Sequence, residues 1–196
     1  MENVLDLTGR LPASRRRRIA DNGVIGMLIF VGTEVMFFAG LVSAFTIGQT
    51  TAIGGWPPPG QPRLPIGATA LNTAALLASG ALLYVAARAY RSDPPRALKP
   101  FLASIVLGTF FVIFQGAEWV ALIREGLTLT TSTHGAFFYL IVGIHGLHAV
   151  IALGVLAWAF RLLLQKNLAS SVFATVQIFW YFVVGVWPVL YWRVYL

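Results

Sequence analysis

Five long apolar segments constrain this 196-residue chain more than any other feature of its sequence. Each is long enough to cross the hydrocarbon core of a bilayer as a helix, which takes about 20 residues. Helices are expected because backbone polar groups in lipid must be satisfied within the spanning segment. The sequence therefore predicts an all-α membrane protein with five transmembrane helices, at residues 22–47, 66–90, 100–123, 134–164 and 172–195.

The composition supports the membrane class and excludes several kinds of function. Hydrophobic residues make up 58% of the chain and charged residues 11%, with a mean hydropathy of +0.77. A soluble domain would be about 25% charged. The chain has no cysteine, which excludes disulfides, thiolate metal sites, iron–sulfur clusters and cysteine catalysis. The net charge of +7 lies mainly in short loops between apolar segments, so we do not expect nucleic acid as a partner.

The basic residues predict the orientation, because short cytoplasmic loops are enriched in lysine and arginine. One side carries the tail arginines and two basic loops, and the other side has far fewer basic residues. We expect a cytoplasmic N-terminus, an external C-terminus, a basic cytoplasmic tail over residues 1–21 and a single five-helix domain over residues 22–196. The first group is Arg10, Arg15–Arg18, Arg88, Arg91, Arg96, Lys99, Arg161 and Lys166, and the second is Arg63, Arg124 and Arg193.

Four ionisable side chains lie inside the apolar segments, namely Glu34, Glu118, His145 and His148. Each costs at least about 2.5–3.5 kcal/mol at bilayer depth, so such groups are usually functional. At about 1.5 Å per helical residue, Glu34 is about 18 Å from the cytoplasmic end, near the middle of the membrane. Two interpretations of Glu34 remain open: a polar anchor for helix packing, or a proton-linked or regulatory group.

The spacing of the other polar groups predicts their partners. Gln115 and Glu118 are three residues apart and share a helix face, which favours a structural hydrogen bond. His145 and His148 also share a face, but a metal site needs more ligands, so we predict hydrogen-bonded structural histidines and no metal. By depth along the helices, Glu34 is expected to pair with His148, or less favourably with His145. An unpaired buried polar group costs about 1–3 kcal/mol.

Three further features lead to expectations about packing and lipid. Arg88, Arg91 and Arg96 lie where they could contact an anionic phospholipid head group. Gly143 and Gly154 offer a surface for close approach of another helix. Pro188 should kink or loosen the last helix.

Several blocks in order resemble subunit III of the haem-copper respiratory oxidases, in its short five-helix bacterial form. Residues 33–40 read Thr-Glu-Val-Met-Phe-Phe-Ala-Gly, and Asn72-Thr73 matches the Asn-Thr pair of the next helix. Gln115, Glu118 and Trp119 match a Gln-x-x-Glu-aromatic pattern, and residues 143–148 match a block with two histidines. Near the end of the chain, Tyr181 and Val184 stand where the family often has His and Asp.

The resemblance implies an accessory subunit without a redox centre in a proton-pumping terminal oxidase of the bacterial cytoplasmic membrane. Such a subunit packs on catalytic subunit I, where the haem and copper reside, among other oxidase subunits. It binds phospholipid and supports proton uptake and catalytic durability, and a respiratory supercomplex is a further possible assembly. Glu34 falls on the carbodiimide-reactive glutamate of the family.

Other functions share some of these sequence features. The related accessory protein of a nitric oxide reductase shares much of the pattern. Ser79-Gly80 invites comparison with an intramembrane serine protease, but position 77 is Leu, so the Gly-x-Ser-Gly form is missing. A proton-coupled transporter could use Glu34 and the histidines, yet the sequence lacks the internal repeats of that class.

Overall fold

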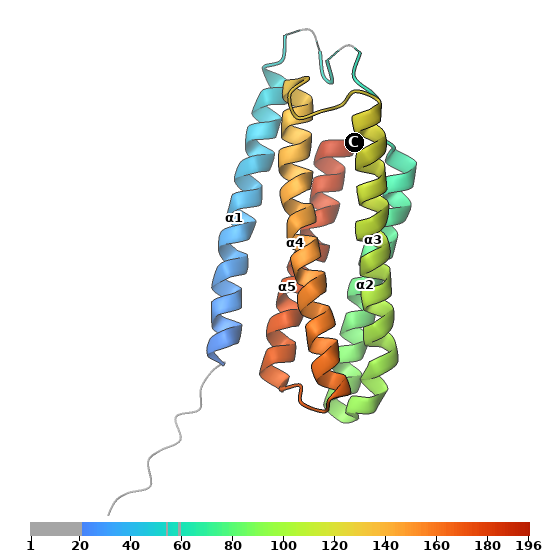
Figure 1. The fold of residues 1–196 in the computed structure, drawn as a ribbon. Coiled ribbons are helices and arrows are strands. Elements are labelled where there is room, and N and C mark those ends of the chain that lie inside the picture. The colour runs from blue at the N-terminus through green and yellow to red at the C-terminus, as the bar shows by residue number, and fades with distance from the viewer. Residues whose placement is uncertain (1–20, 54, 59) are drawn as a thin grey trace, which may run out of the picture.

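The computed structural model describes residues 21–53, 55–58 and 60–196, so the predicted basic tail lies, except for Asp21, outside the described residues. The described part contains five helices long and apolar enough to cross a membrane (Figure 1). This confirms the predicted all-helical membrane class. The helices are α1 (Asn22–Thr50), α2 (Ile66–Ser92), α3 (Leu98–Arg124), α4 (Thr133–Leu164) and α5 (Ser170–Leu190), with a 3₁₀ turn at Pro94–Ala97 and a π-helical turn at Tyr191–Tyr195.

Threonine hydroxyls extend the end of α1 beyond the predicted boundary at residue 47. The hydroxyls of Thr50 and Thr51 donate to the carbonyl of Ile47 over 3.0 and 2.8 Å, and the Thr51 backbone N–H donates to the same oxygen. These hydroxyl bonds add to the backbone bond that the Ile47 carbonyl already accepts, and so strengthen the last turn of the helix. The predicted start of α4 shifts for a similar reason, because the Ser132 side chain accepts from the Gly135 N–H and caps the helix.

Prolines shape the boundaries of α3 and α5. Pro100 lies in the first turn of α3, where a missing N–H removes no helical bond, so α3 begins at Leu98 rather than at residue 100. Pro188 lies inside α5 and removes a donor from its last turns. The α-helix ends at Leu190 and continues as the π-helical turn, which is the loosening predicted for this segment.

The helices do not pack in simple chain order. α1 lies against α5 and α4, while α2 packs on α3 and α5. The connection from α1 to α2, residues 51–65, therefore crosses the end of the bundle, as Figure 1 shows at the top. This places α1 at one side of the molecule and leaves most of its length exposed.

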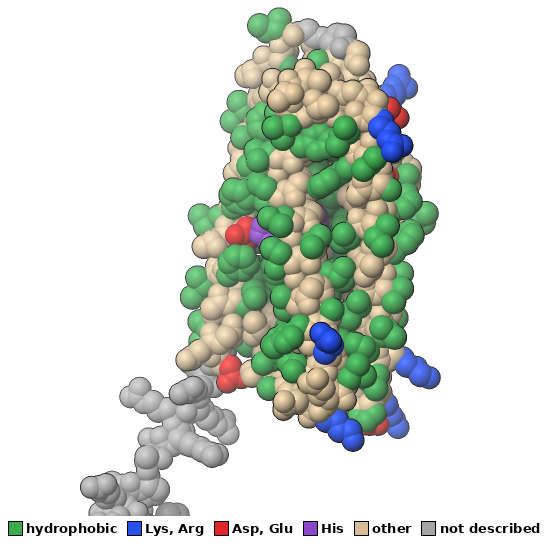
Figure 2. All heavy atoms as spheres, in the orientation of Figure 1, with side chains coloured by type: hydrophobic (Ala, Val, Ile, Leu, Met, Phe, Trp, Pro, Cys, Tyr) green, Lys and Arg blue, Asp and Glu red, His purple; other side chains and the backbone are tan. Residues whose placement is uncertain are grey.

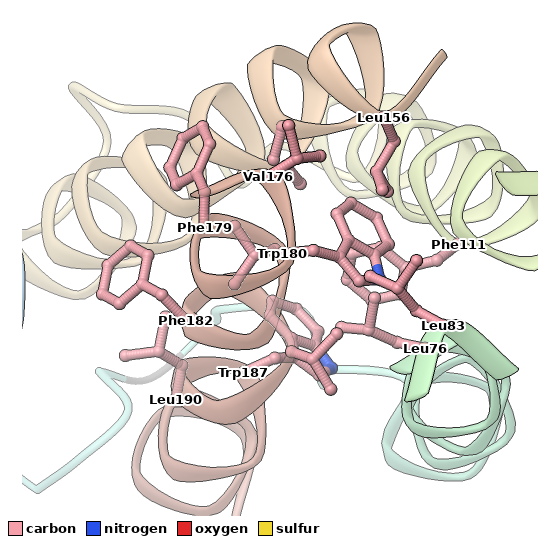
Figure 3. Close-up of a cluster of buried hydrophobic side chains, with 14 of the residues drawn as sticks. Leu76, Leu83, Phe111, Leu156, Val176, Phe179, Trp180, Phe182, Trp187 and Leu190 are labelled. Atoms are coloured by element: carbon pink, nitrogen blue, oxygen red, sulfur yellow. The ribbon is translucent and has the colours of Figure 1, made fainter. Parts of the chain in front are cut away.

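Two tryptophans of α5 form the centre of the core. Trp180 and Trp187 are fully buried, and Figure 3 shows both pointing toward Leu76 and Leu83 of α2 and Phe111 of α3. Phe111 meets Trp187 edge-to-face at 4.9 Å between ring centroids. Large aromatic rings in this arrangement contribute packing beyond the area they bury.

The indole N–H groups also find polar partners on α2. Trp180 donates to the Ser79 hydroxyl over 3.2 Å, and Trp187 donates to the Thr73 hydroxyl over 2.8 Å. Ser79 and Ser104 exchange hydroxyl–carbonyl bonds of 2.8 Å that join α2 to α3. The core therefore joins three helices by packing and by hydrogen bonds that need no water.

The two glycines predicted to allow close approach of another helix are open within this chain. A Cβ atom at Gly154 would meet nothing within 4 Å, and one at Gly143 would only touch Trp119 at 3.8 Å. Close contacts inside the bundle occur at other glycines, among them Gly146, where a Cβ would lie 3.0 Å from Trp119, and Gly108, where it would lie 2.7 Å from Trp180. The surface at Gly143 and Gly154 stays a prediction about contact with a helix outside this chain.

Charged side chains gather toward the two ends of the bundle. Figure 2 shows lysines and arginines there, with a mainly hydrophobic surface between them. This distribution is the one a membrane-spanning bundle requires, because charge is least costly at the interfaces.

The Gly108 contact predicts a difference between two glycines of the same helix. Gly108→Ala should lower the thermal unfolding midpoint in detergent, since overpacking a rigid core costs about 1–3 kcal/mol. Gly116→Ala is the matched control: a Cβ there meets nothing within 4 Å, so it should leave the midpoint unchanged or raise it. Equal midpoints for the two variants would show that Trp180 moves freely and that the core is not tightly fixed.

Candidate functional site

Glu34 of α1 and His148 of α4 form the one carboxylate–histidine contact among the described residues. Glu34 Oε2 lies 3.3 Å from His148 Nε2, and the two side chains are 20% and 14% exposed. The other ring nitrogen, His148 Nδ1, lies 2.8 Å from the carbonyl oxygen of Ile144. The predicted pairing of Glu34 with His148 rather than His145 is therefore confirmed.

The geometry of this pair limits the hydrogen bonds that it can form. A carbonyl oxygen only accepts, so His148 Nδ1 carries a hydrogen and donates to Ile144. Nε2 then contacts Glu34 in one of two ways: a protonated carboxyl donates to the neutral ring, or the imidazolium donates to a carboxylate. Both arrangements contain the same number of protons. In both arrangements the Glu34–His148 contact is a single hydrogen bond between the carboxyl group and the imidazole.

His145, one turn earlier on α4, has a different environment. It is 1% exposed, and neither ring nitrogen has a hydrogen-bond partner in the described part of the chain. Its ring stacks on Trp187 at 5.0 Å, and Phe38 meets both His145 and His148 edge-on. The prediction of a hydrogen-bonded structural histidine was wrong for His145, because its neighbours on the other helices are the aromatic rings of Trp187, Phe38 and Phe111, which offer no hydrogen-bond partner to its nitrogens.

Glu118 of α3 lies in a second polar cluster nearer the C-terminal end of the bundle, meaning the end that carries residues 51–65, 125–132 and 191–196. The Thr69 hydroxyl lies 3.2 and 3.1 Å from its two oxygens. Gln115 Nε2 donates to Glu118 over 3.2 Å and to the Tyr195 hydroxyl over 3.0 Å. The predicted bond between Gln115 and Glu118 is confirmed, and the cluster ties α2, α3 and the π-helical turn together.

Sequence reasoning missed three members of this cluster. Thr69 and Tyr195 bond within it, and Asn72 Nδ2 donates to the Phe111 carbonyl and to Gln115. The polar residues at positions 69, 72, 73 and 79 form a stripe on one face of α2, with helical spacing. That stripe could have indicated a face packed against another helix, whereas nothing local could have indicated Tyr195.

The two carboxyl groups in the membrane segments are held differently. Glu34 faces an imidazole, whereas Glu118 is bonded to neutral groups and has no cationic partner among residues 21–53, 55–58 and 60–196. The hydroxyl of Thr69 and the amide of Gln115 hold the Glu118 carboxyl in place, and neither is an acid or a base in the physiological range. Of the two, Glu34 is therefore the carboxyl group that contacts a basic side chain among the described residues.

The predicted lipid-contacting arginines lie at the opposite end of the molecule, far along the helices from both carboxyl clusters. Arg88, Arg91 and Arg96 are all exposed. Arg96 Nε lies 3.1 Å from Asp93 Oδ2, so its charge is partly compensated. Arg88 and Arg91 make no ion pair with a carboxylate of the described residues.

The described side chains do not support a serine protease at Ser79 or a metal site. Ser79 bonds to Ser104 and Trp180, so the serine–histidine pair of a protease is not formed there. Within the described ranges, no group of three or more His, Asp or Glu side chains could hold a metal ion.

Replacement by phenylalanine should affect the stability of the protein differently at His148 and at His145. His148→Phe should lower the unfolding midpoint, because it leaves the Glu34 carboxyl without its partner at a cost of about 1–3 kcal/mol. His145→Phe should leave the midpoint unchanged or raise it, since it keeps the aromatic stack and removes two unpaired polar atoms. Thermal unfolding of both variants in one detergent checks this. An equal fall for His145→Phe would mean that its nitrogens have partners.

Comparison with known proteins agrees with this architecture. Residues 13–196 match the family model described as cytochrome c oxidase subunit III. The chain is 32% identical over 186 residues to cytochrome c oxidase subunit 3 of Pelomedusa subrufa, covering 90% of this chain and 70% of the relative. It is 31% identical over 178 residues to a probable cytochrome c oxidase subunit 3 of the bacterium Nocardia farcinica, covering 87% and 86%. The human subunit 3 is 32% identical over 179 residues, covering 87% and 67%. With its five membrane-spanning helices, the chain belongs to the cytochrome c oxidase subunit III family.

Proposed function

We propose that this chain is the accessory, non-redox subunit III of a proton-pumping haem-copper terminal oxidase in aerobic respiration. Membership of the family and five apolar helices support the assignment. In this proposal the chain spans a bacterial cytoplasmic membrane, with the N-terminus in the cytoplasm and the C-terminus outside. The relative from Nocardia farcinica and the distribution of basic residues favour that placement.

The proposed main partner is catalytic subunit I, which carries the haem and copper centres. The exposed apolar side chains of α1, among them Leu28, Ile29 and Met36, need lipid or another protein to cover them. Packing on subunit I would place the Glu34–His148 pair near the subunit that reduces oxygen and takes up protons. The chain itself supplies no redox step.

The observation that carries the proposed role is the Glu34–His148 contact in the apolar middle of α1 and α4. A pair that holds one mobile proton can exchange it with a neighbouring proton pathway while remaining neutral. We propose that it supports proton uptake by the complex and protects the catalytic centre during turnover. Glu118, bonded to neutral groups, is assigned a structural role together with Gln115.

Phospholipid is the second proposed partner. Arg88 and Arg91 are exposed and free of carboxylate partners in the described residues, so they suit an anionic head group at the cytoplasmic side. Arg96 contributes less, because Asp93 already compensates its charge.

Glu34→Gln tests the proton-linked role without removing the contact. The glutamine amide keeps the size of the side chain and can donate to His148 Nε2, so assembly and haem content should stay near wild type. Proton uptake during turnover should slow, or the enzyme should inactivate faster, while electron entry stays unchanged. Proton-uptake kinetics and activity decay of the purified oxidase complex measure both effects.

Glu125→Gln is the matched control, because Glu125 is exposed in the loop after α3 and should have no effect. Wild-type proton uptake and durability in Glu34→Gln would reject the proton-linked role. Loss of haem incorporation in that variant would instead assign Glu34 to assembly.

A further inference from the structure

We propose a binding site for one neutral quinone in a cavity between α3 and α4, with its carbonyl oxygens accepting from the N–H groups of His145 and Trp119. The cavity has a volume of about 320 Å³. Ligand pockets in proteins are typically about 300–1,000 Å³, mostly apolar, with a few polar groups that orient the ligand. The proposal rests on the side chains of this chain and does not depend on which complex the chain joins.

The cavity lies in the middle of the membrane-spanning part of the bundle. Its walls come from residues 111–119 of α3, residues 142–150 of α4 and Trp187 of α5. Both stretches are central in their helices. Leu147 and Val150, which also line it, are 58% and 53% exposed on the surface of the bundle. A ligand would therefore enter from the hydrocarbon of the bilayer, where charge is costly and an uncharged molecule is favoured.

His145 is the first group in this cavity that indicates a polar ligand. The residue is 1% exposed, and neither of its ring nitrogens has a hydrogen-bond partner among the described residues. In every protonation state of an imidazole at least one nitrogen carries a hydrogen. His145 thus places a buried N–H donor on the cavity wall, and leaving it without an acceptor costs free energy that a bound oxygen would recover.

Trp119 supplies a second donor from the opposite wall. Its buried Nε1 has no hydrogen-bond partner in the described part of the chain. The indole lies against Gly146, where a Cβ atom would approach it to 3.0 Å, and Tyr139 packs edge-on to it at 6.3 Å. These contacts hold the ring at the cavity wall. An indole N–H donates and does not accept, so a ligand for this position needs an acceptor.

The other lining residues limit the class of the ligand. Gln115, a third polar side chain on the wall, already uses both ends of its amide in bonds to neighbouring side chains. The lining, all of it in the described part of the chain, includes no Asp, Glu, Lys or Arg, so a charged ligand would have no counter-ion. The rings of Phe111 and Trp187 offer flat apolar surfaces, which favour a planar ring.

A quinone meets these requirements together. It is uncharged, it dissolves in the bilayer, its planar ring can pack on aromatic side chains, and its two carbonyl oxygens accept hydrogen bonds without donating. An aliphatic chain would fill the cavity but leave both N–H groups unpaired. A water molecule could accept from them but would leave most of the apolar volume empty. The proposal concerns binding and includes no electron transfer.

The test uses an azido derivative of a short-tailed ubiquinone as a photoaffinity probe on the complex that purifies with this chain. After illumination and digestion, mass spectrometry maps the labelled residues of the chain. Labels should lie within residues 111–119 or 142–150, and unlabelled decylubiquinone should suppress them. Decylbenzene at equal concentration should not suppress them, because it has the same tail and a ring without carbonyl groups.

Four variants test the residues of the site. Trp119→Phe and His145→Phe keep an aromatic ring and remove a donor, so each should raise about fivefold the decylubiquinone concentration that halves the labelling, as expected for loss of one hydrogen bond. Gly116→Phe should fill the cavity and abolish the labelling, because Gly116 is on its wall and a Cβ there meets nothing within 4 Å. Gly154→Phe is the matched control, since Gly154 is equally open but lies outside the cavity.

An unchanged haem spectrum and elution volume show that each variant complex is intact, and the label itself is read on this chain, independently of its partner. Equal suppression by decylbenzene would overturn the proposal in favour of an apolar cavity without preference for a quinone. Labelling that persists in Gly116→Phe would also overturn it. So would labels that lie outside the two stretches or on partner subunits alone.

Discussion

The absence of water inside a bilayer is the constraint on which the rest of this structure depends. Backbone groups are satisfied by helix formation, so each polar side chain in a spanning segment must find its partner inside the bundle. Several of them do so between helices that are far apart in the chain. Trp187 reaches Thr73, Tyr195 reaches Gln115, and His148 reaches Glu34. These contacts align the helices as well as satisfying the polar groups.

The same constraint is met in two different ways by the two membrane carboxyl groups. Glu118 lies among neutral donors that tie α2, α3 and the π-helical turn together. Glu34 lies on the least buried of the five spanning helices, and its partner is the imidazole of His148 on α4. The proton-linked role proposed above therefore depends on Glu34 rather than on Glu118.

Prediction from the sequence succeeded where local rules operate and failed where distant packing decides. Apolar length predicted the five helices, and helical spacing predicted the Gln115–Glu118 bond. Depth along the helices was enough to predict that Glu34 pairs with His148. The unpaired state of His145 was not predictable, because it depends on Trp187 and Phe38 from two other helices. Tyr195 was missed for the same reason, being 80 residues from its partner Gln115.

Tyr181 and Val184, the two residues that depart from the family pattern, have different surroundings in the structure. Val184 packs beside Gly80 of α2, where a Cβ atom on the glycine would approach it to 3.0 Å. Tyr181 lines a groove between α1 and α5, and its hydroxyl has no partner among the described residues. Val184 therefore packs inside the bundle, whereas Tyr181 lies at the groove between α1 and α5.

Purification through an affinity tag on this chain, in mild detergent and followed by an optical spectrum, tests the central claim most directly. The claim predicts that haem absorption bands and a large catalytic subunit co-purify with the chain, and that the chain separated from its partners has no such bands. A functional, monodisperse protein that purifies without any haem-bearing partner would contradict it.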